Sequence, residues 1–196
     1  MEFGERDAAV LQLIEEEELK GFSFDGLKRT LGVHSETLSR VLGRLEGQGV
    51  VQKTSEGYRV TPRGEKLLQV HPLTGGSPSI SLLRTLVPSE VPLSQITSEL
   101  RGRWFGGLRW LGYSLDDLGV TLKWVTEEAA IRIYAVFSDG ELRIEARLRD
   151  GKDLGEAVRA AHQLMGHIAR YYSRPTYLRH VAYLPIFHPY LRPASM

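Results

Sequence analysis

The 196-residue chain contains no cysteine. This absence excludes disulfide bonds, thiolate metal sites and cysteine nucleophiles. The sequence also lacks an apolar run close to the roughly 18 residues that a membrane-spanning helix needs, and its N-terminal residues contain no apolar signal segment. We therefore expect a cytoplasmic protein without a membrane partner.

The chain has almost no net charge, because 25 Lys and Arg residues oppose 24 Asp and Glu residues. Total charge therefore draws the molecule neither to nucleic acid nor to a membrane, and a charged partner has to be bound by a local patch. One sign of charge is missing locally. Residues 157–196 include five Arg and four His but no Asp or Glu.

Motifs of catalysis are missing as well. The sequence has no GxxxxGK[ST] phosphate loop and no GxSxG nucleophile elbow. His162 and His167 are five residues apart, which places them on different helix faces, unlike the i, i+4 pair of a helical metal site. We expect no enzymatic activity, no cofactor and no metal.

The clearest pattern lies between residues 24 and 70. Leu27 and Leu31 share one face of a short helix, and Gly32 follows where a tight turn needs positive φ. Ser35 is placed to N-cap a second helix. That helix has one apolar stripe with the spacing i, i+3, i+4, i+7, formed by Leu38, Val41, Leu42 and Leu45.

The opposite face of the second helix is polar and carries two cations. A helix of this kind, supported by a shorter helix before it, can enter a DNA major groove. Two β-prone runs follow, residues 50–54 and 58–61, and they predict a hairpin with Lys53 and Arg59 near its tip. Pro62 suits the first turn of a closing helix over residues 63–70.

This stretch resembles the winged-helix domains of the MarR and ArsR types of transcriptional regulator. LSRVLGRLEGQGVV is similar to their recognition helix and the entry to the wing, and YRVTPRGEKLL to the wing exit and the next helix. Lys28 departs from the pattern, because a small residue is usual there, and this predicts a looser helix contact. The resemblance covers about residues 6–70, and its helix-turn-helix positions are Leu27, Leu31, Gly32, Val33, Leu38 and Val41.

The resemblance implies a sequence-specific transcriptional regulator that binds double-stranded DNA as a homodimer. Charge placement favours this partner, because residues 26–66 contain eight Lys and Arg but four acids. We expect the acidic run at residues 15–18 to be a solvated face that points away from DNA. The alternative is a winged-helix protein-interaction subunit of a larger transcription or chromosome assembly. Predicted base contacts are Ser35, Thr37, Ser39, Arg40 and Arg44, and predicted backbone contacts are Lys28, Arg29, Lys53, Arg59 and Arg63.

The composition predicts a winged-helix domain over residues 1–72, a linker over 73–78 and a second domain over 79–196. The second domain is expected to be α+β, with a small antiparallel sheet covered by helices. Within the first domain, the first helix is predicted over residues 6–20. In the second domain, helices are predicted over 79–86, 93–111 and 153–172, and strands over 120–125, 130–137 and 141–149.

The sequence Asp139-Gly140 predicts a two-residue hairpin turn, which fixes the strand register. If Ser138 pairs with Glu141, one face of the hairpin is wholly apolar. On the other face Arg132 then lies opposite Arg147. That face is either solvated, with local ion pairs, or a site for an anion or partner.

Two further features carry open alternatives. The aromatic residues Trp104, Phe105, Trp110 and Trp124 form either a core or a pocket for a small-molecule effector. The segment from residue 174 to 196 is apolar, aromatic and interrupted by prolines, so we expect an extended arm. It packs on its own domain, crosses a partner chain in a homodimer, or stacks on nucleic acid, and we favour the dimer arm.

Overall fold

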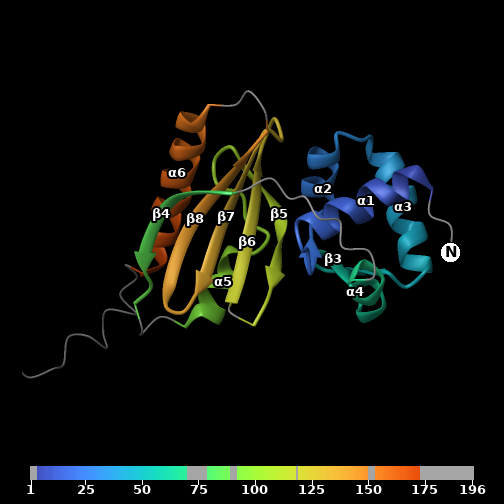
Figure 1. Ribbon diagram of the computed structural model, residues 1–196, viewed down its shortest axis with the longest axis horizontal. Helices are drawn as coiled ribbons and strands as arrows, with labels where there is room; N and C mark the ends of the chain where they lie inside the picture. The colour runs from blue at the N-terminus through green and yellow to red at the C-terminus, as the bar shows by residue number, and fades with distance from the viewer. Residues whose placement is uncertain (1–3, 70–78, 89–91, 118, 150–152, 173–196) are drawn as a thin grey trace, which may run out of the picture.

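A computed structural model of the chain describes residues 4–69, 79–88, 92–117, 119–149 and 153–172 (Figure 1). In these ranges the chain forms six helices and one eight-stranded open antiparallel sheet, so it is α+β as expected. The predicted linker over 73–78 and the predicted arm over 174–196 lie outside the described residues. No helix in the described part is long and apolar enough to cross a membrane.

The N-terminal elements pack around their own apolar cluster. The stripe from Leu38 to Leu45 is buried, and Gly32 has the left-handed φ of 66° that the turn requires. The elements are α1 (Glu5–Glu16), β1 (Gly21–Phe22), α2 (Phe24–Leu31), α3 (Ser35–Gly47), β2 (Val51–Thr54), β3 (Gly57–Val60) and α4 (Pro62–Gln69).

Two expectations for this part are wrong in detail. The first helix ends at Glu16 and not at residue 20, because Glu18 takes a φ of 47° and turns the chain into β1. The N-cap of α3 is His34, and Ser35 is the first helical residue. The side-chain cap forms instead at α2, where the Ser23 hydroxyl accepts the Gly26 N–H at 3.0 Å.

The remaining elements build most of the sheet and cover one of its faces. They are β4 (Ile80–Leu86), α5 (Leu93–Leu100), β5 (Leu108–Leu115), β6 (Gly119–Thr126), β7 (Ile131–Ser138), β8 (Glu141–Leu148) and α6 (Leu154–Tyr172). The predicted β7–β8 register is confirmed, with Ser138 opposite Glu141 and Arg132 opposite Arg147. Asp139 and Gly140 both have positive φ, as a two-residue hairpin turn requires.

Two helix predictions in this part are wrong. Residues 80–86 form the edge strand β4, whose backbone pairs with β8 along one edge. The expected helix over 93–111 ends at Leu100. Gly102 and Gly106 then adopt positive φ and turn the chain, so that β5 can pair with β6.

Helix α6 covers the apolar face of the sheet, as expected for a sheet covered by helices. Ala157, Ala161, Leu164 and Ile168 are fully buried in one cluster with the inward residues of β6, β7 and β8. Leu154, the first residue of the helix, remains 47% exposed. Figure 1 shows α6 and the N-terminal helices on opposite sides of the view, with the sheet between them.

One sheet runs through both parts of the chain, in the order β2-β3-β1-β5-β6-β7-β8-β4. The short strand β1, which the sequence does not predict, pairs with β3 on one edge and with β5 on the other. The two apolar clusters stay separate, one built from residues before 69 and the other from residues after 79. The hairpin β2–β3 is therefore hydrogen-bonded, through β1, to the rest of the sheet.

Candidate nucleic-acid interface

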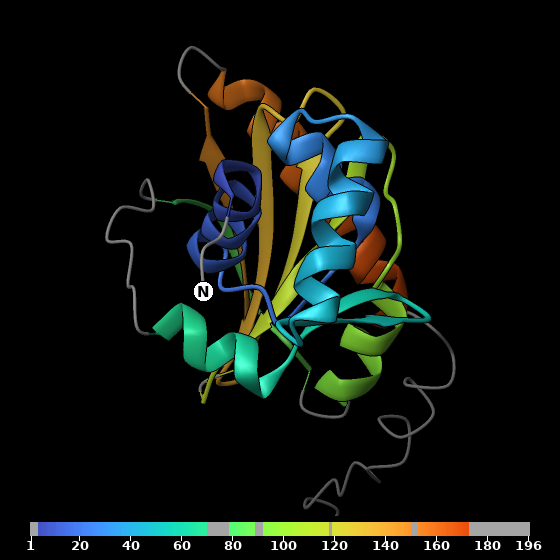
Figure 2. The same ribbon diagram turned by 90° about the vertical axis from the view of Figure 1, so that its right-hand side faces the viewer.

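Helix α3 lies at the end of the molecule that is farthest from α6. Figure 2 looks at this end and shows α3 in the foreground, with the β2–β3 hairpin below it. The inner face of α3 is buried against the N-terminal cluster, while Ser35, Ser39, Arg40 and Arg44 are exposed and Thr37 is half-buried. The five predicted base contacts therefore lie on one helix whose outer side faces solvent.

The arginines of α3 have different partners. Arg40 Nη2 lies 2.5 Å from Glu36 Oε1, and both side chains are about three-quarters exposed. An exposed pair of this kind contributes little to stability, so Arg40 can exchange Glu36 for another acceptor at small cost.

Arg44 instead connects α3 to α1. Its Nη2 lies 2.5 Å from Asp7 Oδ1 and its Nε 3.3 Å from Asp7 Oδ2, and the Asp7 side chain is buried. The hydrogen bond to this carboxylate raises the pKa of Arg44. A two-pronged bond to a buried acceptor holds the guanidinium in place, so the structure gives Arg44 a structural contact in addition to its predicted base contact.

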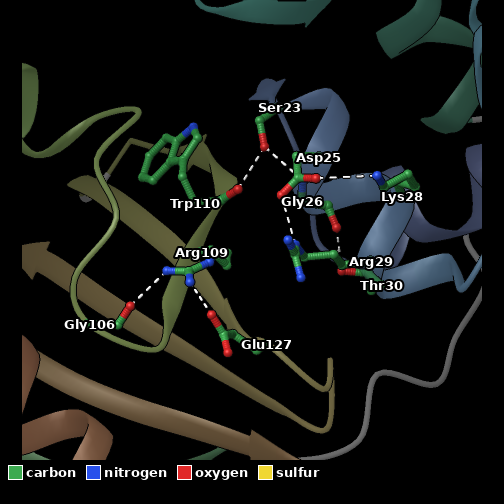
Figure 3. Close-up of polar contacts among 10 residues, drawn as sticks. All are labelled: Ser23, Asp25, Gly26, Lys28, Arg29, Thr30, Gly106, Arg109, Trp110 and Glu127. Atoms are coloured by element: carbon green, nitrogen blue, oxygen red, sulfur yellow. Dashed lines mark hydrogen bonds and ion pairs between the residues drawn. The ribbon is translucent and has the colours of Figure 1, made fainter. Parts of the chain in front are cut away.

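Two predicted backbone contacts on α2 share one carboxylate (Figure 3). Arg29 Nε lies 2.7 Å from Asp25 Oδ2, and Lys28 Nζ lies 3.5 Å from Asp25 Oδ1. Burial raises the pKa of Asp25, but the hydrogen bond from Arg29 and the charges of Arg29 and Lys28 outweigh it, so the pKa is lowered. The three side chains together carry one net positive charge.

The hairpin cations are exposed but do not share a face. Lys53 pairs with Tyr58 and Gln52 with Arg59, and neighbouring residues along a strand point to opposite sides. Lys53 and Arg59 therefore project from opposite faces of the hairpin. The backbone N–H of Lys53 donates to Glu46 Oε1 at 3.1 Å, which ties the hairpin to the end of α3.

Helix α2 is fixed closely to β5 (Figure 3). The Ser23 hydroxyl donates to the Trp110 carbonyl oxygen at 2.6 Å, and the Ser23 N–H donates to the Leu111 carbonyl oxygen at 2.9 Å. A Cβ on Gly26 would lie 2.6 Å from Leu111 Cα, so only glycine allows this approach. The small residue that α2 needs is thus Gly26, two positions before Lys28.

The solvated face predicted for the acidic run is wrong for Glu17, whose exposed fraction is 1%. Glu17 Oε1 accepts hydrogen bonds from Arg132 at 2.7 Å, Arg147 at 2.9 Å and Tyr134 at 3.2 Å. Lys123 Nζ donates to the Glu17 backbone carbonyl and lies 3.8 Å from Oε2. The opposed arginines of the hairpin thus hold an anion, and that anion is the chain's own carboxylate.

This group of five residues, the Glu17 cluster, joins α1 to the sheet face opposite α6. Burial raises the pKa of Tyr134 and lowers the pKa of Lys123. The sequence does indicate an anion site, because Arg132 and Arg147 are directly opposed. It cannot locate the anion, since Glu17 is more than a hundred residues away from both arginines along the chain.

Three of the four predicted pocket aromatics belong to the core. Trp110, Trp124 and Phe105 are buried, with Trp124 lying 5.2 Å from Trp110 and 5.7 Å from Phe105 between ring centroids. Trp104 is 54% exposed. The four rings therefore do not line one pocket.

Across the described ranges, no three His, Asp or Glu side chains are grouped so that they could hold a metal ion. Comparison of the chain with protein-family models, with curated proteins and with solved structures finds no match.

Proposed function

We propose that the protein is a sequence-specific regulator of transcription that binds double-stranded DNA through a winged helix. In this proposal α3 is the recognition helix and β2–β3 is the wing. The observation that carries it is the outer face of α3. It is polar and exposed at one end of the molecule, while the inner face is packed against α1 and α2. A supported helix with a free polar face is what entry into a major groove requires.

The contacts divide into base readout and backbone positioning. Ser35, Thr37, Ser39 and Arg40 read base edges, with Arg40 suited to the O6 and N7 atoms of guanine. Arg44 joins them only where a base competes with Asp7 for its guanidinium. Phosphates are bound by Lys53 and Arg63. Lys28 and Arg29 also bind phosphate, because together with Asp25 they keep one net positive charge. Arg59 contacts the backbone from the other face of the wing.

The part of the chain after residue 79 supplies dimerisation, effector sensing or both in this proposal. The protein acts as a homodimer in which two α3 helices meet two half-sites. The spacing of half-sites on DNA follows the geometry of such a dimer.

Selection of bound duplexes from a random pool is the direct test, since it reports both binding and half-site spacing. On the selected site Arg40→Ala should weaken binding by about 1–3 kcal/mol, with little effect on random duplex. Lys53→Ala should weaken all duplexes alike and reduce the slope of log affinity against log salt by about 0.9. If Arg40→Ala bound the selected duplex as tightly as the unchanged protein does, and the random duplex as well, α3 would not be the recognition helix.

A second function is favoured by the intramolecular pairing of the cations. Asp7 holds Arg44, and Asp25 holds both Lys28 and Arg29, so much of the local positive charge is already neutralised. A polar helix face with few free cations also suits a protein partner, as in a winged-helix subunit of a larger transcription or chromosome assembly. A gel-shift assay at about 100 mM salt separates the two, because the DNA-binding proposal requires a shifted duplex.

A further inference from the structure

A concavity of about 490 Å³ opens between the turn that precedes β5 and the last two turns of α6. It lies in the part of the chain after residue 79 and is separate from the face of α3. Its size is within the range of pockets that hold small molecules. Its lining is Arg103, Trp104, Phe105, His167, Arg170 and Tyr171.

The charged side chains that line the concavity are cationic. No carboxylate belongs to its lining, and neither Arg103 nor Arg170 takes part in the ion pairs found among the described residues. Arg170 Nε donates to the Gly166 carbonyl oxygen at 3.3 Å, a neutral acceptor on its own helix. Because residues 157–172 contain no Asp or Glu, α6 beyond Glu156 supplies no side-chain counter-charge.

The exposed aromatic ring of Trp104 is in contact with a cation. The guanidinium carbon of Arg109 lies 4.6 Å from the centroid of the Trp104 ring, which is a cation–π contact. Arg109 is itself held by the Gly106 carbonyl oxygen at 2.7 Å and by the carboxylate of Glu127 (Figure 3). One face of the indole is therefore covered by the Arg109 guanidinium, and Trp104 is still 54% exposed.

A pair of aromatic rings lines the concavity beside Trp104. The rings of Phe105 and His167 lie 4.8 Å apart between centroids. Burial, and next the charge of Arg170, lowers the pKa of His167, so its imidazole is neutral at pH 7. The site thus combines flat apolar surfaces with two guanidinium groups.

We propose that this concavity binds a nucleoside phosphate, with the base stacked on Trp104 and the phosphate bound by Arg103 and Arg170. Aromatic side chains stack on any nucleobase, because every base has a π-face. Arginine presents a planar fork of donors that matches phosphate oxygens. Two arginines without a carboxylate suit a doubly charged phosphate better than a singly charged group. The site does not depend on the proposed DNA contacts of α3.

AMP is the probe, titrated into the full chain by calorimetry and by tryptophan fluorescence. We expect binding, with a change in emission that Trp104→Phe abolishes while it keeps most of the affinity, since phenylalanine still offers a ring for stacking. Trp104→Ala should weaken binding about 5- to 100-fold. Arg103→Gln combined with Arg170→Gln should weaken it about 10- to 100-fold. Arg159→Gln is the matched control, because Arg159 is an exposed arginine of α6 that lines a different hollow. The affinity of this variant for AMP should equal that of the unchanged chain.

Adenosine and inorganic phosphate test the two halves of the ligand separately, and each should bind more weakly than AMP. If adenosine bound as tightly as AMP, the arginines would have no role in binding. If phosphate bound as tightly as AMP, Trp104 would have none. The proposal is also overturned if millimolar AMP gives neither heat nor an emission change. It is equally overturned if AMP binds the Trp104→Ala variant and the double arginine variant as well as it binds the unchanged chain. Circular dichroism of each variant verifies that it is folded.

Discussion

Replacement of Glu17 by Gln should destabilise the protein strongly. Glutamine has the same shape as glutamate and keeps one acceptor oxygen, so packing around the side chain is preserved. The charge is lost, however, while Arg132, Arg147 and Tyr134 can still donate to the remaining oxygen, because all three donate to Oε1. The amide nitrogen then takes the place of Oε2, which lies 3.8 Å from the Lys123 ammonium. The substitution therefore isolates the electrostatic part of the Glu17 cluster.

The magnitude follows from burial. Removal of one partner from a buried ion pair costs about 3–5 kcal/mol, because the other charge is left without compensation. The side chains of Arg132 and Arg147 are each 19% exposed, so water can partly solvate the guanidinium groups that lose their acceptor. The side chain of Lys123 is only 7% exposed. We expect a loss near the lower end, about 3 kcal/mol, which is a large part of the 5–15 kcal/mol that stabilises a typical domain.

Urea unfolding followed by circular dichroism and tryptophan emission measures this loss. Glu18→Gln is the matched control, because it removes the same charge from the next residue, which is exposed, and should change stability by less than about 0.5 kcal/mol. A double-mutant cycle with Arg147→Met should show coupling, since each substitution removes the same contact. Equal stabilities of Glu17→Gln and Glu18→Gln would refute the reasoning.

Three other substitutions test separate contacts. Gly26→Ala should destabilise by about 1–3 kcal/mol in urea unfolding, because its Cβ would meet the backbone of β5. By contrast, Gly43→Ala in α3 meets nothing and should stabilise by about 0.5–1 kcal/mol, and equal effects of the two would contradict the close approach of α2. Asp25→Asn should release Lys28 and Arg29 and so raise the affinity for all duplexes alike. In gel shifts, the slope of log affinity against log salt should become steeper by about 0.9 per added phosphate contact. An unchanged slope would count against Lys28 and Arg29 as phosphate contacts. The hydrogen bond from Arg84 lowers the pKa of Glu141 from its ordinary value of 4.5. The stabilisation by the Arg84–Glu141 pair is therefore present above pH 4.5 and is lost as pH falls through the lowered pKa. In urea unfolding, Glu141→Gln should thus lose less stability than the unchanged chain between about pH 6 and about pH 3. Equal losses for the two proteins would show that the pair is not formed.

The sequence predicts best where local chemistry determines the structure. Gly32 marks the turn between α2 and α3, and Asp139-Gly140 sets the β7–β8 register, because both turns need positive φ. The buried stripe of α3 follows from helical spacing and leaves the candidate base contacts outside. These features depend on residues that are close together along the chain.

The failures depend on partners that are distant along the chain. Residues 108–115 become a strand because β1 and β6 flank them, and Gly21–Phe22 is too short to show any periodicity of its own. At the candidate interface, Arg44 finds Asp7 on another helix, 37 residues earlier. Glu17 looks like part of a solvated acidic run until the sheet places two arginines beside it. Spacing along the sequence cannot reveal such pairings.

The double pairing of β1 has a consequence for the newly made chain. At about 5–20 residues per second, synthesis needs on the order of 4–17 seconds to proceed from β1 to the start of β5. During that interval one edge of β1 has no partner strand from the chain, and Glu17 has none of the cations that later surround it. An open strand edge can pair wrongly with another chain. The two-residue length of β1 keeps this edge too short to template such pairing while the ribosome completes β5.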